Sequence, residues 1–164
     1  MKNINIDAYS HIKIKKTNMS FVVLRPNDLA QMGDLIGQGN KDIITWIGKT
    51  VGRNIAEVVD QVESPKNHQE FLQITCKNLE NLGFGTISIM EYNEGSYVSI
   101  KVDKPLYEDL DENQDIISTI YQGVFLGIFE FLGYTTTGLD EDSAWKNTNI
   151  DYSLFKFTFG EVVA

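Results

Sequence analysis

The stretch from Asp111 to Gly133, DENQDIISTIYQGVFLGIFEFLG, is the longest strongly apolar run in the chain, and it constrains the fold more than any other segment. Asp111 with Gln114 fits a capping box, in which each side chain satisfies a free backbone donor at a helix start. Gly133 fits the left-handed residue that commonly ends a helix. The segment therefore predicts a helix buried on several sides, since its apolar positions cover more than one face: Ile116, Ile117, Ile120, Tyr121, Val124, Phe125, Ile128, Phe129 and Leu132.

A membrane-spanning helix is the alternative interpretation of this run, because about 20 apolar residues suffice to cross a bilayer. Asp115, Gln122 and Glu130 lie inside it, and buried charge is costly in lipid. The sequence contains no second span. We therefore favour the central helix of a soluble core, in which Asp115, Thr119, Gln122 and Glu130 mark the strip that meets water.

Composition limits the classes of partner. A chain of 164 residues, 42% of them hydrophobic, fits one domain that buries about 70% of its unfolded surface. With 14 basic and 23 acidic residues the formal net charge is -9, which disfavours nucleic acid and anionic membranes as partners. Cys76 is the single cysteine, so a disulfide within the chain and a multi-cysteine zinc site are excluded. Because the N-terminus lacks an apolar signal region, we expect a cytoplasmic location.

Residue periodicity predicts mostly extended structure first and helices next. Residues 1–25 alternate polar and apolar side chains, which is typical of strands. We expect residues 1–18 to form an N-terminal extended segment and residues 19–164 a single domain. A short helix is expected after Arg25-Pro26 with Asn27 as its cap, a long helix from Asp42, and a third helix from Ser64-Pro65 to Gly83.

The second half predicts a small sheet around the central helix. Residues 86–102 alternate with period two around the turn Asn93-Glu94-Gly95, which indicates a β-hairpin. The segment Tyr134 to Asn149 is polar and is expected to be irregular. The strand Tyr152 to Phe159 places Ser153, Phe155, Phe157 and Phe159 on one side. The fold class is therefore α+β, an α/β two-layer arrangement with helices packed on a small antiparallel sheet.

Both long helices contain two glycines one turn apart. Gly48 and Gly52 lie in the first long helix, and Gly123 and Gly127 lie in the central one. Glycine lets another backbone approach closely, at a cost of about 1 kcal/mol per residue relative to alanine. These pairs predict that the two helices approach each other, or a symmetry mate, at short distance.

The order and spacing of four segments resembles the 4-vinyl reductase domain family, and it is similar to small subunits of the TRAPP vesicle-tethering complex, which share that fold. The segments are GKTVGRNIAE at 48–57, NLGFGTISI at 81–89, IYQGVFLGIFEFLGY at 120–134 and SLFKFTF at 153–159. The resemblance covers about residues 20–160. It implies an α/β two-layer fold, commonly a homodimer, and binding of small apolar molecules in a hydrocarbon-binding or sensory role.

This sequence departs from the family pattern at two kinds of cysteine. Many members carry cysteines between the central helix and the last strand, proposed as metal ligands, where this chain has Trp145 and Ser153. No metal site and no cofactor is therefore predicted. The lipid-modified cysteine of some tethering subunits precedes the third helix, where this chain has Glu63 and Ser64. Because Cys76 falls later, on an apolar helix face, we interpret it as a buried structural thiol.

The sequence identifies no catalytic residues. His11 and His68 are far apart and belong to no recognisable motif, and Gly37-Gln38-Gly39 lacks the third glycine and the βαβ context of a dinucleotide site. Fold analogy with a reductase is weak support for an enzyme. We therefore favour a non-catalytic protein while leaving the enzyme question open.

Three functional hypotheses follow. The first is a small-molecule binding or sensory module whose apolar site lies between the helices and the sheet, lined by Trp46, Phe71, Phe84, Phe125 and Phe129. For each of these residues, ordinary core packing is the alternative role. The second is a structural subunit that acts through a dimer interface, as TRAPP subunits do. The third is a vinyl reductase-type accessory protein of tetrapyrrole metabolism.

Overall fold

The computed structural model describes residues 4–6, 12–14, 20–21, 24–36, 41–108 and 110–160. The helices are α1 (Pro26–Ile36), α2 (Lys41–Glu63), α3 (His68–Asn81) and α4 (Gln114–Phe131). The strands are β1 (Ile4–Ile6), β2 (Ile12–Ile14), β3 (Ser20–Phe21), β4 (Thr86–Asn93), β5 (Tyr97–Asp103), β6 (Thr136–Ser143) and β7 (Tyr152–Phe159). The predicted α+β class is confirmed.

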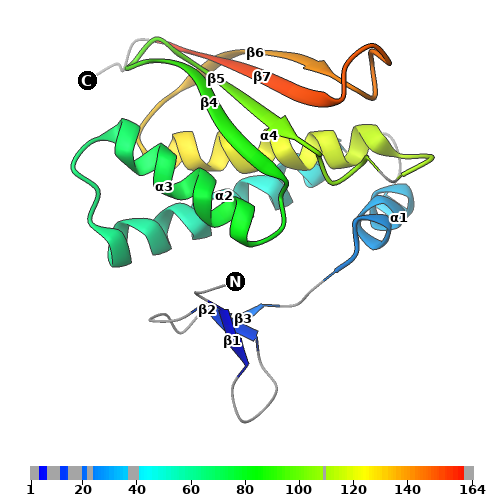
Figure 1. The fold of residues 1–164 in the computed structure, drawn as a ribbon, viewed down its shortest axis with the longest axis horizontal. Helices are drawn as coiled ribbons and strands as arrows, with labels where there is room; N and C mark the ends of the chain where they lie inside the picture. The colour runs from blue at the N-terminus through cyan, green and yellow to red at the C-terminus, as the bar shows by residue number, and fades with distance from the viewer. Residues whose placement is uncertain are drawn as a thin grey trace.

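The strands form two antiparallel sheets. A small N-terminal sheet has the order β1-β2-β3, and the main sheet has the order β4-β5-β7-β6. The main sheet covers α4 on one side, as Figure 1 shows. The three short strands described before residue 22 agree with the sequence pattern, whereas the proposed domain boundary between residues 18 and 19 stays a prediction.

Aromatic side chains join α4 to the main sheet. Phe155, Phe157 and Phe159 alternate along β7 and are buried, as the period-two pattern predicts. Phe129 of α4 meets Phe157 with ring centroids 4.9 Å apart, and Phe125 meets Phe155 at 5.7 Å. These separations lie in the range of favourable aromatic pairs, each of which adds about 1 kcal/mol beyond its buried area.

The opposite side of α4 crosses α2 at the predicted glycines. A Cβ placed on Gly52 would lie 1.9 Å from the carbonyl oxygen of Val124, and one on Gly127 would lie 2.2 Å from the carbonyl oxygen of Lys49. The two backbones are therefore in direct contact. The prediction of close helix approach is confirmed, with the second helix of the same chain as the neighbour.

Both α3 and α4 end at the predicted glycines. Gly133 has φ +83, and the N–H of Tyr134 bonds the carbonyl of Phe129 at 2.9 Å. Gly83 has φ +95, with the matching bond from Phe84 to Leu79 at 3.1 Å. This is the Schellman arrangement, in which the left-handed residue favours glycine because it has no Cβ.

The predicted helix starts are less accurate. The capping box at Asp111 is wrong, because Asn113 is the N-cap and the Gln114 side chain donates to the carbonyl of Leu110. Helix α1 starts at Pro26, so Asn27 lies inside it. Helix α3 starts after Ser64-Pro65, since Asn67 is its cap and its side chain accepts the backbone N–H of Glu70 at 2.8 Å.

Two further expectations are wrong. The segment expected to be irregular contains β6, which pairs along its length with β7. The polar strip of α4 does not face water as a whole, because Thr119 is buried and Asp115 and Gln122 are half-buried, with Glu130 exposed. Among the described residues, no helix combines the length and the apolar character that a membrane crossing requires.

Replacing Gly52 with alanine should lower the free energy of unfolding by about 3 kcal/mol, because the new methyl group meets a backbone carbonyl that cannot move alone. The gain in helix propensity, about 1 kcal/mol, opposes this only in part. Urea unfolding measures the difference. Gly138→Ala is the control, since its Cβ would make an ordinary 3.5 Å contact with Thr158. Equal stability of the two variants would contradict the close crossing.

Candidate functional site

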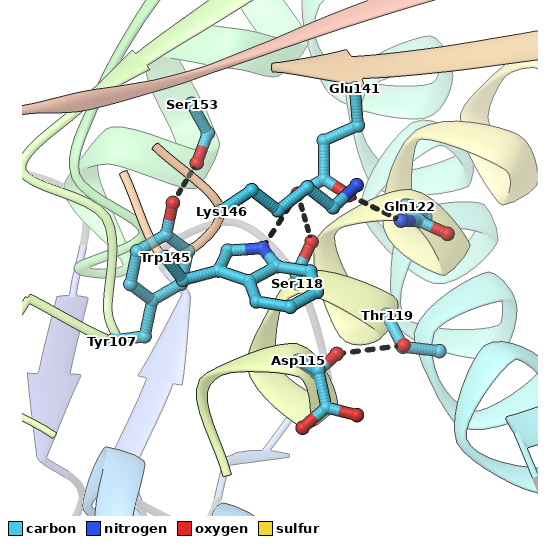
Figure 2. A network of polar contacts seen from close by, with 9 residues as sticks. All are labelled: Tyr107, Asp115, Ser118, Thr119, Gln122, Glu141, Trp145, Lys146 and Ser153. Atoms are coloured by element: carbon cyan, nitrogen blue, oxygen red, sulfur yellow. Dashed lines mark hydrogen bonds and ion pairs between the residues drawn. The ribbon is translucent and has the colours of Figure 1, made fainter. Parts of the chain in front are cut away.

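The inward side of β6 carries a buried carboxylate. Glu141 has a side chain only 3% exposed, and it faces α4. Its oxygens accept hydrogen bonds from Ser118 Oγ, from Gln122 Nε2 at 3.0 Å, from Trp145 Nε1 at 3.0 Å and from Lys146 Nζ at 2.7 Å. Figure 2 shows these side chains converging on the carboxylate. We call Glu141, Ser118, Gln122, Trp145 and Lys146 the Glu141 cluster.

Three elements position the cluster. Ser118 and Gln122 lie one turn apart on α4, so both side chains face the same strand. Trp145 and Lys146 lie in the turn after β6, which is closed by the bond from the Lys146 N–H to the Ser143 carbonyl at 2.9 Å. Because of this turn, the indole N–H of Trp145 and the ammonium group of Lys146 point back toward the carboxylate of Glu141.

Glu141 is held in its ionised form. Burial by itself raises the pKa of this carboxyl, but the hydrogen bonds from Lys146, Ser118 and Trp145, together with the nearby Ser143 hydroxyl, outweigh that effect, and the net pKa lies below its ordinary value. Hydrogen bonds to the charged form favour that form. The cluster is thus a buried anion whose charge is balanced by one partly exposed lysine.

Next to the cluster, a buried hydroxyl has no partner. Ser143 is fully buried, and its Oγ has no hydrogen bond within the described part of the chain. It lies close enough to Tyr107 and to Glu141 to lower the pKa of each. An unsatisfied buried polar atom costs about 1–3 kcal/mol, so it needs an explanation such as a bound water or ligand group.

Tyr107 supplies a neutral phenol at the same place. Its hydroxyl is hydrogen-bonded to Ser153 Oγ, and burial raises the pKa of Tyr107 more than this hydrogen bond and the nearby Ser143 hydroxyl lower it. The phenol therefore stays protonated at neutral pH. Together the groups offer an anionic acceptor, neutral hydroxyls and two aromatic rings, which suits binding of a neutral molecule with a polar group.

The positions where the family resemblance places metal ligands are occupied by these contacts. Trp145 donates its indole N–H to Glu141, and Ser153 is bonded to Tyr107. Within residues 41–108, 110–160 and the other described segments, no three His, Cys, Asp or Glu side chains lie close enough together to hold a metal ion.

Three of the five predicted lining residues lie in one row of aromatic rings. Phe84 contacts Tyr121 at 5.9 Å, Tyr121 contacts Phe125 at 6.4 Å, and Phe125 and Phe129 both contact Phe157, at 5.9 and 4.9 Å. We call these rings the aromatic row. Tyr121 lies on the same helix as Ser118 and Gln122, so the row runs alongside the Glu141 cluster.

The other two predicted residues lie elsewhere. Phe71 on α3 stacks on Phe131 at 5.7 Å, and Trp46 on α2 is 66% exposed. The locations of the five residues do not show whether they bind a ligand, so that role stays a prediction. Trp46 is placed where a partner could contact it.

His68, which belongs to no sequence motif, is half-buried. Its Nδ1 lies 2.6 Å from the hydroxyl of Tyr134, which in turn lies 3.2 Å from the hydroxyl of Tyr92. Glu94 is 3.5 Å from the same ring nitrogen. These contacts connect the start of α3 to the hairpin and to the end of α4, which is a structural role.

A small cleft lies at the N-terminal end of α4, next to α1 and α2. It has a volume of about 20 Å³, which holds about one water molecule, and it is lined by Gly33, Lys41, Ile44, Asn113, Asp115, Ile116 and Thr119. Asp115 and Thr119 lie below the cluster in Figure 2. In its present form this cleft is too small for an organic ligand.

Sequence reasoning did not identify the Glu141 cluster. Its members are spread from residue 118 to residue 146 and belong to no short motif. The sequence does contain one signal for this strand, because Leu139, Glu141 and Ser143 occupy alternate positions of β6. Its pairing partner, β7, was predicted correctly. Recognising β6 would have placed Glu141 and Ser143 on the face toward α4.

No protein-family model matches the sequence, and no curated protein sequence matches it. Solved structures do match. The phenol-responsive sensory domain of the transcription activator PoxR, in complex with phenol, has a TM-score of 0.71 at 10% identity, covering 96% of this chain and 85% of that one.

Two more similar structures correspond to the predicted resemblance. A trafficking protein particle complex subunit 3 from Naegleria fowleri, covalently bound to palmitic acid, has a TM-score of 0.59 at 13% identity, covering 85% of this chain and 97% of that chain. A vinyl-4-reductase family protein from Methanocaldococcus jannaschii has a TM-score of 0.56 at 18% identity, covering 86% and 85%. At these identities the likeness shows the fold alone, and at that level the predicted resemblance is confirmed.

Replacing Glu141 with glutamine should lower the free energy of unfolding at pH 7 by about 2 kcal/mol, because charged hydrogen bonds are lost. Since the pKa of Glu141 is lower in the folded chain, its charge stabilises the fold above the unfolded pKa of about 4.3, and this contribution is lost as the pH falls through the folded pKa. The difference between variant and parent should therefore shrink in acid. Urea unfolding from pH 7 to pH 3 measures it.

The matched control for this experiment is Asp142→Asn, one residue further along β6, where the carboxylate is exposed. We expect a change below about 0.5 kcal/mol at pH 7. If the two variants lose the same stability, or if the Glu141→Gln difference is independent of pH, the buried anion is not stabilised as described.

Cys76 should be unreactive in the folded chain. It is buried on α3, and burial, with a smaller contribution from the Glu80 carboxylate, raises the pKa of its thiol to about 12. At pH 8 about one thiol in 10⁴ is then ionised. A disulfide reagent such as DTNB should label Cys76 only after unfolding in guanidinium. Rapid labelling of the native chain would contradict the interpretation of a structural thiol.

Proposed function

We propose that this chain is a non-catalytic small-molecule binding domain with a sensory role, and that its ligand is a small apolar molecule carrying one neutral polar group. The observation that carries the proposal is the unpartnered, fully buried hydroxyl of Ser143 beside the Glu141 cluster. The ligand's polar group would bond to this hydroxyl, and its apolar part would lie along the aromatic row.

The charge of the cluster supports a particular class of ligand. Glu141 is ionised and buried, so a second anion at Ser143 would be repelled in surroundings that screen charge poorly. Tyr107 remains a neutral phenol. An alcohol or phenol can both donate to and accept from Ser143, whereas a carboxylate can only accept. Ligands with a hydroxyl should therefore bind in preference to carboxylates of the same size.

The aromatic row supplies the apolar wall. Phe84, Phe125 and Phe129 belong to it, and they are the predicted lining residues that we retain for this role. Its rings are in contact with one another, so a ligand has to separate α4 from the strands or replace a ring contact on entry. The similarity to a phenol-responsive sensory domain whose structure contains phenol supports a small phenolic ligand for this fold.

A second candidate function is that of a subunit that acts through self-association. The observation in its favour is the exposure of large apolar side chains on the first two helices, with Leu35 88% and Trp46 66% exposed. Contiguous exposed apolar surface commonly marks protein contacts. We propose a homodimer in the cytoplasm, in which residues 19–164 form the ligand-binding domain. Light scattering over a dilution series tests the dimer, and a monomer at micromolar concentration contradicts it.

Ligand binding can be tested with phenol, benzyl alcohol and benzoate. We expect phenol and benzyl alcohol to raise the melting temperature in a saturable way, because a ligand that binds only the folded state stabilises it, and benzoate to have much less effect. Ser143→Ala should weaken the response to benzyl alcohol. Ser96→Ala, in the exposed hairpin turn, is the control.

Native mass spectrometry of the same samples shows whether the stabilising molecules are bound at one per chain. The proposal is contradicted if none of the three molecules stabilises the fold or forms a complex. It is also contradicted if benzoate binds as well as benzyl alcohol, because the buried anion would then not select the ligand.

A further inference from the structure

The carboxylate of Glu141 is bound from two sides. Its Oε1 atom accepts hydrogen bonds from Ser118 of α4 and from Trp145. Its Oε2 atom accepts hydrogen bonds from Gln122 of α4 and from Lys146. Each oxygen therefore has one donor from α4 and one from the turn after β6, so a movement of that turn leaves both oxygens with a partner.

The two pairs of donors differ in their freedom to move. Helix α4 is fixed by its backbone contacts with α2 at Gly52 and Gly127. Trp145 and Lys146 belong instead to the connection between β6 and β7, residues 144–151, which we call the β6–β7 loop. A loop can open at a smaller cost than a packed helix, because it makes fewer buried contacts.

The β6–β7 loop is hydrogen-bonded within itself. Its base is closed by the bond from the Ala144 N–H to the Tyr152 carbonyl at 2.9 Å. The N–H groups of Lys146 and Asn147 both bond the Ser143 carbonyl, at 2.9 and 3.0 Å. These bonds hold the turn in shape without the help of Glu141, so the loop can move about its base as one unit.

The loop also lies on the solvent side of the site. Ser143, Ser153 and Tyr107 are buried, with no more than 1% of any of them exposed. Trp145 is half-buried and packs on the core, whereas the Lys146 side chain is 41% exposed. Figure 2 shows both loop side chains reaching into the cluster, with Tyr107 and Ser153 beside them. Displacing these two side chains therefore exposes the buried groups to solvent.

We propose that the β6–β7 loop is a lid, which opens to admit small neutral molecules to Ser143 and closes when Trp145 and Lys146 bind Glu141 again. This inference rests on the proposed function, because it supplies the route by which a ligand reaches that site. Opening breaks two of the four hydrogen bonds to the carboxylate. Water can replace the two lost donors, so the anion is not left without partners. Loops that open in this way commonly control entry to binding sites.

Opening of the lid can be measured by the reactivity of a thiol at position 143. In Ser143→Cys, the small neutral reagent iodoacetamide should react only when the lid is open. Adding Lys146→Met should raise the labelling rate about 10-fold or more, because the closed state then lacks one charge-assisted hydrogen bond. Loss of this cation disfavours a nearby thiolate, so faster labelling cannot come from a more reactive thiol. Mass spectrometry of a digest measures the label at each cysteine.

A second measurement needs no change at position 143. The indole N–H of Trp145 is bonded to Glu141 in the closed state, so its exchange with deuterium requires the loop to open. Lys146→Met should raise this exchange rate by a similar factor. NMR follows it beside the indole of the exposed Trp46, which should exchange rapidly in both proteins.

Two controls separate lid opening from other effects. Cys76 is buried on α3 and reports unfolding of the whole chain, so its labelling should stay slow in every variant. Lys77→Met removes an ion pair with Glu80 on α3, which Figure 1 shows well away from the connection between β6 and β7. It should change the labelling rate of Ser143→Cys by less than about twofold, as expected for an exposed ion pair.

The lid is overturned if Lys146→Met leaves the labelling of Ser143→Cys and the exchange of the Trp145 indole unchanged. It is also overturned if labelling of Cys76 accelerates equally, because the whole chain would then be unfolding. Binding of benzyl alcohol to the parent chain is measured separately. If the labelling pattern holds and benzyl alcohol does not bind, the proposed ligand is wrong and the lid stands. If benzyl alcohol binds and labelling does not respond, the lid is wrong and the proposed function stands.

Discussion

The close crossing of α2 and α4 is the constraint on which the rest of the structure depends. Gly48 meets Gly123, Gly52 meets the backbone of Val124, and Gly127 meets the backbone of Lys49, with no room for a methyl group at any of the four glycines. Lys49 and Glu130 form an ion pair across the same two helices. Because glycine is unfavourable inside helices, a sequence that places four of them here gives up local stability to obtain contact between backbones.

This crossing fixes which side of α4 faces the sheet. With one side against α2, Phe125 and Phe129 are directed to β7, and Ser118 and Gln122 are directed to β6. The part of the helix that carries Ser118 and Gln122 is thus largely covered, so polar side chains there need buried partners. Glu141 provides them, and its own charge is in turn stabilised by Trp145 and Lys146. The polar cluster is a consequence of burying this part of α4 against the sheet.

The parts of the fold that depend on a local sequence pattern could largely be predicted. The strand Tyr152–Phe159 was predicted with its boundaries because its phenylalanines alternate, and the helix ends at Gly83 and Gly133 follow from the need for a left-handed residue. Helix starts were less predictable, since Asp111, Asn113 and Asn67 are all chemically suitable caps and tertiary packing selects among them.

The candidate site was less predictable for a different reason. Strand β6 was missed because its inward positions include Glu141 and Ser143, and the hydrophobic alternation that identifies a strand is therefore absent. The five predicted lining residues were chosen because they are aromatic. The sequence does not show that Trp46 lies outside the core while Phe125 lies inside it. The inward positions of β6 and the burial of these aromatic side chains both depend on contacts between segments that are distant in the chain.

The most direct test of a ligand site at the Glu141 cluster uses the two tryptophans of the chain. The indole N–H of Trp145 is bonded to Glu141, whereas Trp46 is exposed on α2, so the two side-chain resonances in a ¹⁵N NMR spectrum report on the site and on the surface. On titration with benzyl alcohol, the account predicts a saturable shift of the Trp145 resonance while that of Trp46 stays in place. A shift confined to Trp46, or no shift of either, would contradict it.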